Sequence, residues 1–178
     1  EVSSTACFIA KYTEELLDSK DLELAVLATM IDTVSFHSTK GRKEDKDWCK
    51  YICDKYNLDY QKIYNQGLYL TNMNNIEEAS LNGLKKYEIN NKKVQSSYIQ
   101  IENPNSEITK IKEILNILKR YLIENKLEAF VFIIHDMTKF KSMYYLIEKN
   151  NIKERYYDTY EQRGNTIMPE VLEYVNNK

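Results

Sequence analysis

Apolar residues recur at helical spacing through the first third of the chain. The helices that this pattern predicts cover residues 4–17, 21–34, 44–56 and 60–66. Ser3 or Ser4 is suited to capping the first of them, because a serine hydroxyl accepts a hydrogen bond from a free backbone N–H group. The second helix is apolar on most sides, so we expect it to be buried.

After residue 75 the pattern mixes extended and helical segments. Two extended runs, 85–89 and 92–102, flank Asn90-Asn91, a pair that tolerates the positive φ of a tight hairpin turn. The clearest amphipathic helix covers residues 107–125. The other predicted elements are a short helix over 76–82, buried strands over 128–134 and 142–148, and a final helix over 169–176. Together these elements predict an α/β fold.

The periodicity fades in the segment 67–75, which we interpret as a hinge between two lobes. Residues 1–66 then form a helical lobe, and residues 76–178 form a lobe around a mixed sheet. The chain begins at Glu1 rather than Met and enters a structured segment almost at once. We therefore expect it to come from inside a longer protein.

Composition narrows the class of protein. The 178 residues carry a net charge of −2, so no overall basic character indicates a nucleic-acid partner. No apolar run reaches the roughly 18 residues of a membrane span, so no membrane contact is predicted. The cysteine count of 3 is odd, which suits a reducing compartment and predicts a cytoplasmic protein. Cys49 and Cys53 have no matching Cys/His pair downstream and are interpreted as core residues.

Asp32 is the first candidate for chemistry, because it interrupts the apolar run 24–38. A carboxylate in such surroundings is usually paired, caps a helix or holds a metal ion, since an unpartnered buried charge costs several kcal/mol. Spacing alone favours a structural carboxylate that nearby backbone or a lysine satisfies.

Other polar residues also have both a functional and a structural interpretation. His135-Asp136 ends a predicted strand, where α/β proteins tend to bind ligands, but a capping or turn aspartate is the more common use. Lys85 belongs to a basic run beside the hairpin turn, and such runs are usually solvated strand edges. Arg163 precedes the last helix and suits phosphate binding, although a surface arginine is the simpler interpretation. Glycine-rich phosphate-binding motifs do not occur, so phosphate chemistry here must rest on metals, Lys and Arg.

Five segments, taken in order, resemble the DHH phosphoesterases, in the branch that holds family II inorganic pyrophosphatases, exopolyphosphatases and prune-type enzymes. Residues 2–6 (VSSTA) are similar to V-G-[SC]-T-A, and residues 28–38 (ATMIDTVSFHS) to A-I-[IL]-[SL]-D-[TS]-x-x-F-x-S. Residues 85–94 (KKYEINNKKV) are similar to K-[ED]-F-x-x-x-x-K-K-V, residues 133–137 (IIHDM) to V-I-T-D-I, and residues 162–169 (QRGNTIMP) to S-R-K-K-Q-V-V-P. These segments follow the family's order and extend over nearly the whole chain.

The resemblance implies roles for three residues. Asp32 falls on a metal ligand of the family, and Lys85 and Arg163 fall on contacts to substrate phosphate. The implied cofactor is a pair of Mg²⁺ or Mn²⁺ ions, and the implied substrate is polyphosphate or pyrophosphate. Residues 1–66 then correspond to the C-terminal helical part of the DHH lobe. Residues 76–178 correspond to the smaller, substrate-binding DHH-associated domain, with the active site in the cleft between the lobes.

Two departures from the family pattern change the expected function. Gly164-Asn165 stands where pyrophosphatases carry Lys-Lys, which favours an exopolyphosphatase-like enzyme. The D-x-D and D-H-H motifs, which carry the other metal ligands, do not occur, so we expect the chain to be inactive without its longer parent. The alternatives are a family II pyrophosphatase, a prune-like phosphodiesterase, or a non-catalytic module that binds phosphate compounds or a protein partner. The sequence leaves the oligomeric state open.

Overall fold

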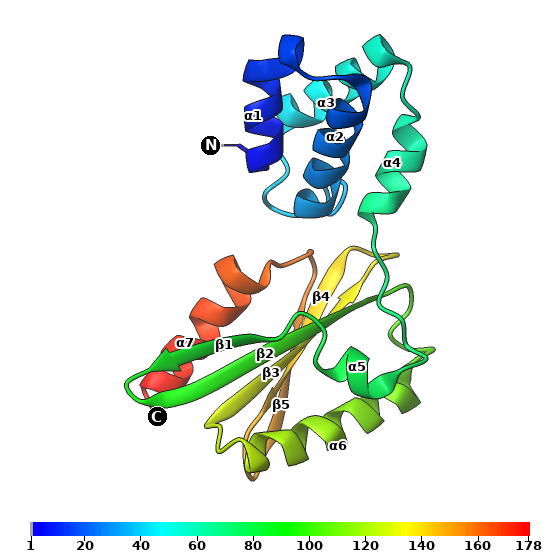
Figure 1. Ribbon diagram of the computed structural model, residues 1–178. Helices are drawn as coiled ribbons and strands as arrows, with labels where there is room; N and C mark the ends of the chain where they lie inside the picture. The colour runs from blue at the N-terminus through cyan, green and yellow to red at the C-terminus, as the bar shows by residue number, and fades with distance from the viewer. Residues whose placement is uncertain (1) are drawn as a thin grey trace. The chain divides into compact units, whose positions relative to one another are not determined.

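The computed structural model describes residues 2–178, which divide into one compact unit that ends at Tyr69 and a second that begins at Leu70 (Figure 1). The first unit contains α1 (Thr5–Thr13), a 3₁₀ turn η1 (Glu14–Leu16), α2 (Ser19–Thr33), α3 (Lys43–Tyr56) and α4 (Tyr60–Gly67). The second contains α5 (Ile76–Ser80), β1 (Lys85–Ile89), β2 (Lys92–Ile101), α6 (Ile108–Glu124), β3 (Ala129–Asp136), β4 (Lys141–Ile147), β5 (Ile152–Tyr157), a π-helical turn η2 (Arg163–Ile167) and α7 (Met168–Asn176). None of these helices is long and apolar enough to cross a lipid bilayer.

Side-chain caps explain where the first helices begin. The Ser4 hydroxyl accepts a hydrogen bond from the backbone N–H of Ala6, which confirms one of the two predicted caps of α1. The Asp18 carboxylate accepts from the backbone N–H groups of Lys20 and Asp21 and so caps α2. The four helices of this unit share one core, formed by Ala10, Leu22, Val26, Met30, Cys49, Ile52, Cys53 and Ile63.

The prediction that α2 is buried on most sides is wrong. Its core face is fully buried, but Leu24 and Ile31 on the opposite side are 61% and 53% exposed. In the same unit Phe8 and Tyr12 of α1 are also exposed, with ring centroids 4.9 Å apart. Side chains point in all directions around a helix, so an apolar run longer than one turn places apolar residues on more than one face. One packed neighbour covers only one of these faces and leaves the other exposed.

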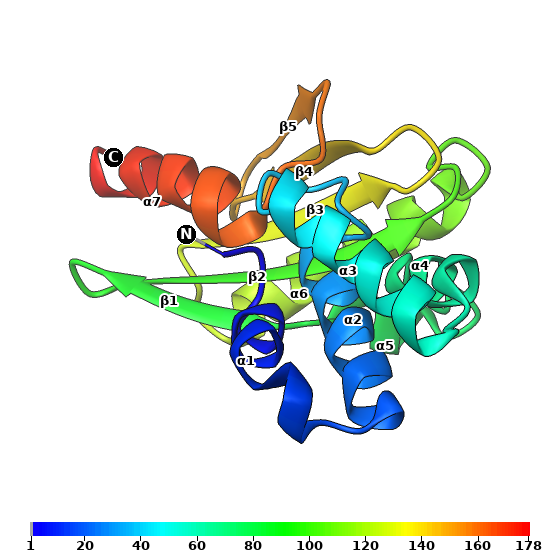
Figure 2. The ribbon, with the colours of Figure 1, turned by 90° about the horizontal axis from the view of Figure 1, so that it is seen from above.

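The second unit is built on a five-stranded sheet in the order β1-β2-β3-β4-β5. Strands β2 and β3 are parallel and are joined through α6, whereas the other neighbouring pairs are antiparallel. Asn90 and Asn91 have φ of 48° and 62°, so the predicted hairpin turn between β1 and β2 is present. The hairpin tip and the last turn of α7 lie at the same end of the second unit (Figures 1 and 2), where the Lys92 ammonium donates to the Val175 carbonyl at 2.9 Å.

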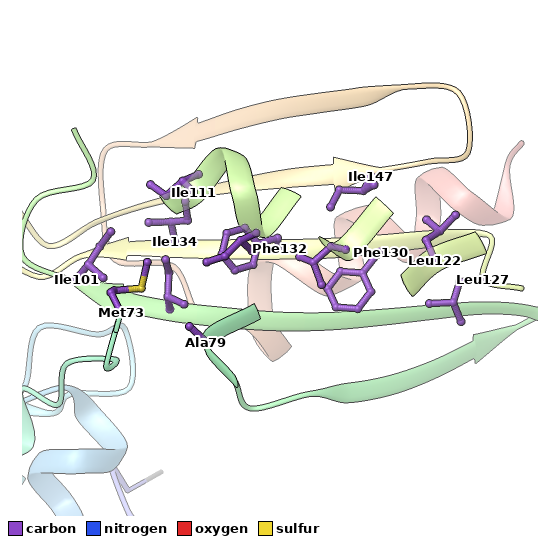
Figure 3. Packing of buried hydrophobic residues seen from close by; sticks show 13 residues of the cluster. Met73, Ala79, Ile101, Ile111, Leu122, Leu127, Phe130, Phe132, Ile134 and Ile147 are labelled. Atoms are coloured by element: carbon purple, nitrogen blue, oxygen red, sulfur yellow. The ribbon is translucent and has the colours of Figure 1, made fainter. Parts of the chain in front are cut away.

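The two faces of the sheet have separate cores, because side chains along a strand alternate between faces. On one face α5 and α6 cover the largest core, in which Phe130, Phe132 and Ile134 of β3 meet Ile111 and Leu122 of α6 (Figure 3). On the other face α7 covers Val131 and Ile133 of β3 together with residues of β4. These layers make the α/β fold with a mixed sheet that the sequence predicted.

Strand β5 and the turn η2 were not predicted. β5 reads IKERYY, and its side chains are exposed except for partly buried Tyr157, so it lacks the apolar alternation of a half-covered strand. Thr71 donates its backbone N–H to the Gln100 carbonyl at 2.8 Å, so the chain is attached to the second unit from this point. The assignment of the two units to a DHH lobe and a substrate-binding domain stays a prediction.

Candidate functional site

Arg163 and Lys85 lie at the same edge of the second unit, although they are 78 positions apart in the sequence. Arg163 begins the turn η2, and its Nη1 donates to the Gly83 carbonyl. Gly83 lies just before β1, and Lys85 is the first residue of that strand. Arg163 is therefore attached to the backbone two residues from Lys85.

Neither of these two cations is neutralised within the part of the chain that the structure describes. No carboxylate of residues 2–178 lies within ion-pair distance of Lys85 or Arg163, whereas Lys11, Lys55, Lys141 and Arg155 are all paired. Lys85 is exposed and Arg163 is half-buried. Two unpaired cations at one edge are suited to binding an anion with several charged oxygens, such as a phosphate group.

An aromatic layer lies beneath Arg163. Its Cζ is 5.2 Å from the centroid of the Tyr98 ring, and the edge of that ring meets His135 at a centroid distance of 6.0 Å. His135 in turn stacks on Tyr160, with ring centroids 4.3 Å apart and an angle of 18° between the planes. The layer comes from β2, β3 and the segment before η2, so it exists only in the folded unit.

His135 is neutral in this layer. Burial lowers the pKa of its imidazole to about 3, and the positive charge of Arg163 acts in the same direction. The Glu161 backbone N–H donates to the Ser142 hydroxyl, which leaves the hydroxyl hydrogen for His135 Nδ1, 2.9 Å away. His135 therefore does not exchange protons near neutral pH. Its neighbour Asp136 accepts from the backbone N–H groups of Thr138 and Lys139 in the turn that follows, so the interpretation of a capping or turn aspartate is confirmed.

Asp32 belongs to the first unit, where it is exposed on the last turn of α2. The three residues Val34, Ser35 and Phe36 just beyond it have φ of 52°, 50° and 67°. This conformation is unfavourable for residues other than glycine, most of all for β-branched Val34. The turn is held by Ser35. Its backbone N–H donates to the Met30 carbonyl and its hydroxyl donates to the Tyr64 backbone carbonyl, both at 2.6 Å. Strain of this kind occurs often at functional sites.

Asp45 of the first unit was not among the residues that the sequence pattern predicted to be functional. It lies on the buried stripe of α3, four positions before Cys49, and is 3% exposed. Burial alone would raise the pKa of its carboxyl, but hydrogen bonds from the Lys11 ammonium and the Ser3 backbone N–H outweigh it and lower the pKa to about 2. A charged residue on an apolar stripe is a signal that sequence inspection alone can find. We interpret the Lys11–Asp45 ion pair as structural, because each charge is neutralised by the other.

No group of three or more His, Cys, Asp or Glu side chains within residues 2–178 is arranged to hold a metal ion. The described residues therefore do not fit a two-metal centre by themselves. Asp32 is the one predicted ligand in this part of the chain, and its role stays a prediction.

Comparison with solved structures gives a full-length match in fold. The structure of a Methanococcus jannaschii protein described as a "putative family II inorganic pyrophosphatase" superposes with a TM-score of 0.82 over 99% of this chain, at 20% sequence identity. The chain spans 66% of the length of that protein. No family model matches the chain. No curated protein matches it either. The chain thus has the fold of part of a family II inorganic pyrophosphatase, and this confirms the fold that the resemblance implied.

Proposed function

We propose that the chain is the phosphate-binding C-terminal part of a metal-dependent hydrolase of phosphoanhydride bonds, with an exopolyphosphatase-like preference for polyphosphate. The observation that carries this proposal is the pair of unpaired cations, Lys85 and Arg163, joined through the Gly83 backbone. The fold shared with a pyrophosphatase supports a hydrolase that acts on linked phosphates. Both residues lie at the same edge of the second unit, and phosphate binding is the predicted role of each.

The chemistry of these residues suits that function. In hydrolysis of a phosphoanhydride, negative charge develops on the phosphoryl oxygens, and fixed cations stabilise it. Lys85 contributes a compact charge and Arg163 a planar group with several N–H donors. The Asp32 carboxylate is the kind of oxygen ligand that Mg²⁺ or Mn²⁺ prefers, and such an ion would activate the attacking water. The other ligands would have to come from outside this chain.

The exposed apolar side chains of α1 and α2 support a role within a longer polypeptide. Phe8, Ile9, Tyr12, Leu24 and Ile31 are each between 45% and 78% exposed in the first unit. Such a group of large apolar residues usually marks an interface. We therefore expect catalysis from the longer polypeptide and none from the 178 residues alone.

The preference for polyphosphate rests on Gly164 and Asn165. Both are exposed and uncharged, so the turn η2 offers one cation where pyrophosphatases offer three. A short, highly charged substrate such as pyrophosphate loses more from this change than a long chain does. The alternative is pyrophosphate hydrolysis itself, which the shared fold with a pyrophosphatase favours.

The test is turnover by the longer polypeptide with Mg²⁺ or Mn²⁺ on pyrophosphate, tripolyphosphate, long polyphosphate and cyclic nucleotides. We expect phosphate release from long polyphosphate to be fastest. Lys85→Ala and Arg163→Ala are each expected to weaken apparent substrate affinity about tenfold or more, because each removes a charge-assisted hydrogen bond. Lys86→Ala and Arg120→Ala remove the same charge from exposed positions nearby in sequence or on α6, and serve as matched controls.

Three results would contradict parts of the proposal. Turnover of pyrophosphate alone would replace the polyphosphate preference with the pyrophosphatase alternative. Tripolyphosphate binding without any turnover would indicate a non-catalytic phosphate-binding module. Equal affinities of Lys85→Ala and Lys86→Ala would remove Lys85 from the binding site.

A further inference from the structure

The guanidinium of Arg163 is fixed from two directions, by the Tyr98 ring on one side and by the Gly83 carbonyl on another. A cation over the face of an aromatic ring at this distance is attracted by the ring's quadrupole. We propose that Tyr98 is a positioning residue, which holds Arg163 in the orientation that receives a substrate phosphate. The inference rests on the proposed phosphate contact of Arg163.

Tyr98 can hold another side chain because its own position is determined by its neighbours. Its backbone N–H donates to the Asn82 carbonyl at 3.1 Å, and the Asn82 side chain returns a hydrogen bond to the Tyr98 carbonyl at 2.9 Å. Gly83 has φ of +60°, and a Cβ placed there would lie 2.3 Å from Cε1 of the ring. The ring therefore packs directly against a backbone that only glycine allows it to approach.

The Tyr98 ring also meets His135 in an edge-to-face contact, and His135 is 3% exposed and held by Ser142. Because His135 is neutral, it adds no second positive charge beneath Arg163. The sequence thus supplies a support for the guanidinium that is aromatic, rigid and uncharged. The attraction between Arg163 and the ring is not opposed by a neighbouring cation.

The advantage of this arrangement is preorganisation. A free arginine side chain loses conformational entropy when it is immobilised, and this loss would reduce the affinity for phosphate. Because Tyr98 and Gly83 already hold the Arg163 side chain in the folded protein, this entropy is lost when the chain folds and not when phosphate binds. Phosphate then meets an arginine that is already oriented beside Lys85.

The first measurement is an NMR spectrum of the arginine Nε–H groups in the 178-residue chain without ligand. The chain has only Arg42, Arg120, Arg155 and Arg163, so conservative replacement of each assigns the signals. A group over a ring face is shifted upfield, and we expect the Arg163 signal to be shifted relative to that of exposed Arg120. Tyr98→Leu should abolish the shift, and Tyr98→Phe should keep it. An Arg163 signal at the position of Arg120 in the unaltered chain overturns the proposal without any variant.

The second measurement is calorimetric titration of the same proteins with tripolyphosphate. We expect Tyr98→Leu to weaken binding roughly three- to fivefold and Tyr98→Phe to restore it, since the ring and not the hydroxyl makes the contact. Equal affinity of the leucine and phenylalanine variants overturns the positioning role. Unchanged affinity in Arg163→Ala instead overturns the phosphate contact, and with it the proposed function, while the NMR shift still reports the Tyr98 contact separately.

Discussion

At the scale of single residues, the Asp32 carboxylate lies where its own helix disfavours it. It is the next-to-last residue of α2, where the outward carbonyl groups give the helix end a partial negative charge. Within residues 2–178 it makes no hydrogen bond or ion pair. The strained turn that follows adds a second unfavourable feature at the same point. Residues that cost stability are typical of functional sites, which supports the proposed role of Asp32 without testing it.

Removing this charge gives the first stability prediction. We expect Asp32→Asn to raise the free energy of unfolding of the 178-residue chain by about 0.3–1 kcal/mol, because the repulsion with the helix end disappears. Urea unfolding followed by the fluorescence of Trp48, the single tryptophan, reports on the first unit. Asp47→Asn removes the same charge from an exposed position within α3 and should bring no such gain. A loss of stability in Asp32→Asn would show that the carboxylate makes a stabilising contact.

At the scale of elements, the turn η2 connects the anchored Arg163 to α7. Gly164 has open space around its Cα, with no atom within 4 Å of a Cβ built there, and Asn165 is exposed. The turn thus has room for a larger side chain at Gly164, whereas the exposed Asn165 amide donates to the Gln162 side-chain oxygen at 2.8 Å. The backbone of η2 would allow a cationic side chain at Gly164, so the absence of one there is a matter of the residue type.

We therefore expect Gly164→Lys combined with Asn165→Lys to change substrate preference, with a loss of stability limited to that of the exposed Asn165–Gln162 hydrogen bond. In the longer polypeptide, turnover of pyrophosphate should rise relative to turnover of long polyphosphate, because two cations are added beside Arg163. Replacing both residues with Gln gives the same bulk without charge and should leave the ratio as it was. An unchanged ratio in the lysine variant would mean that η2 does not set the substrate preference.

At the scale of the whole molecule, each unit has its own core and its own acid-sensitive group. In the second unit, burial and then Arg163 lower the pKa of His135 from 6.5 to about 3, so between these values the unfolded chain binds a proton that the folded chain does not. Stability therefore falls as the pH drops through this window. In the first unit, Asp45 has its pKa lowered from 3.8 to about 2, and its stabilising contribution is lost only as the pH falls through that lower range.

The prediction is that His135→Asn flattens the pH dependence of stability of the second unit between pH 6.5 and 4. Hydrogen exchange of the backbone amides of β2 and β3 reports on the sheet, and Trp48 fluorescence reports on the first unit. His37 also has its pKa lowered, by burial and then by Lys46, so His37→Asn is the matched control and should change only the fluorescence transition. A pH slope of the sheet signal that is the same with and without His135 would contradict the prediction.

The sequence by itself determined the features that depend on neighbours along the chain. Helical spacing predicted α1 to α4 and α6, Pro169 predicted the start of α7, and Asn90-Asn91 predicted the hairpin, because backbone propensity and turn chemistry act over a few residues. The candidate residues Asp32, Lys85 and Arg163 also came from the sequence, through ordered motifs. Their roles stay predictions.

Only the tertiary structure decided which surfaces and side chains meet. It exposed one apolar face of α2, added the polar strand β5, and set Arg163 against Tyr98 and Gly83, which lie 65 and 80 positions earlier in the sequence. Such contacts depend on the packing of the sheet and not on local pattern, since a strand edge or a cation over a ring leaves no periodic signal in the residues that form it. For this reason the sequence identified Arg163 as a candidate, whereas its contact with the Tyr98 ring is visible only in the folded structure.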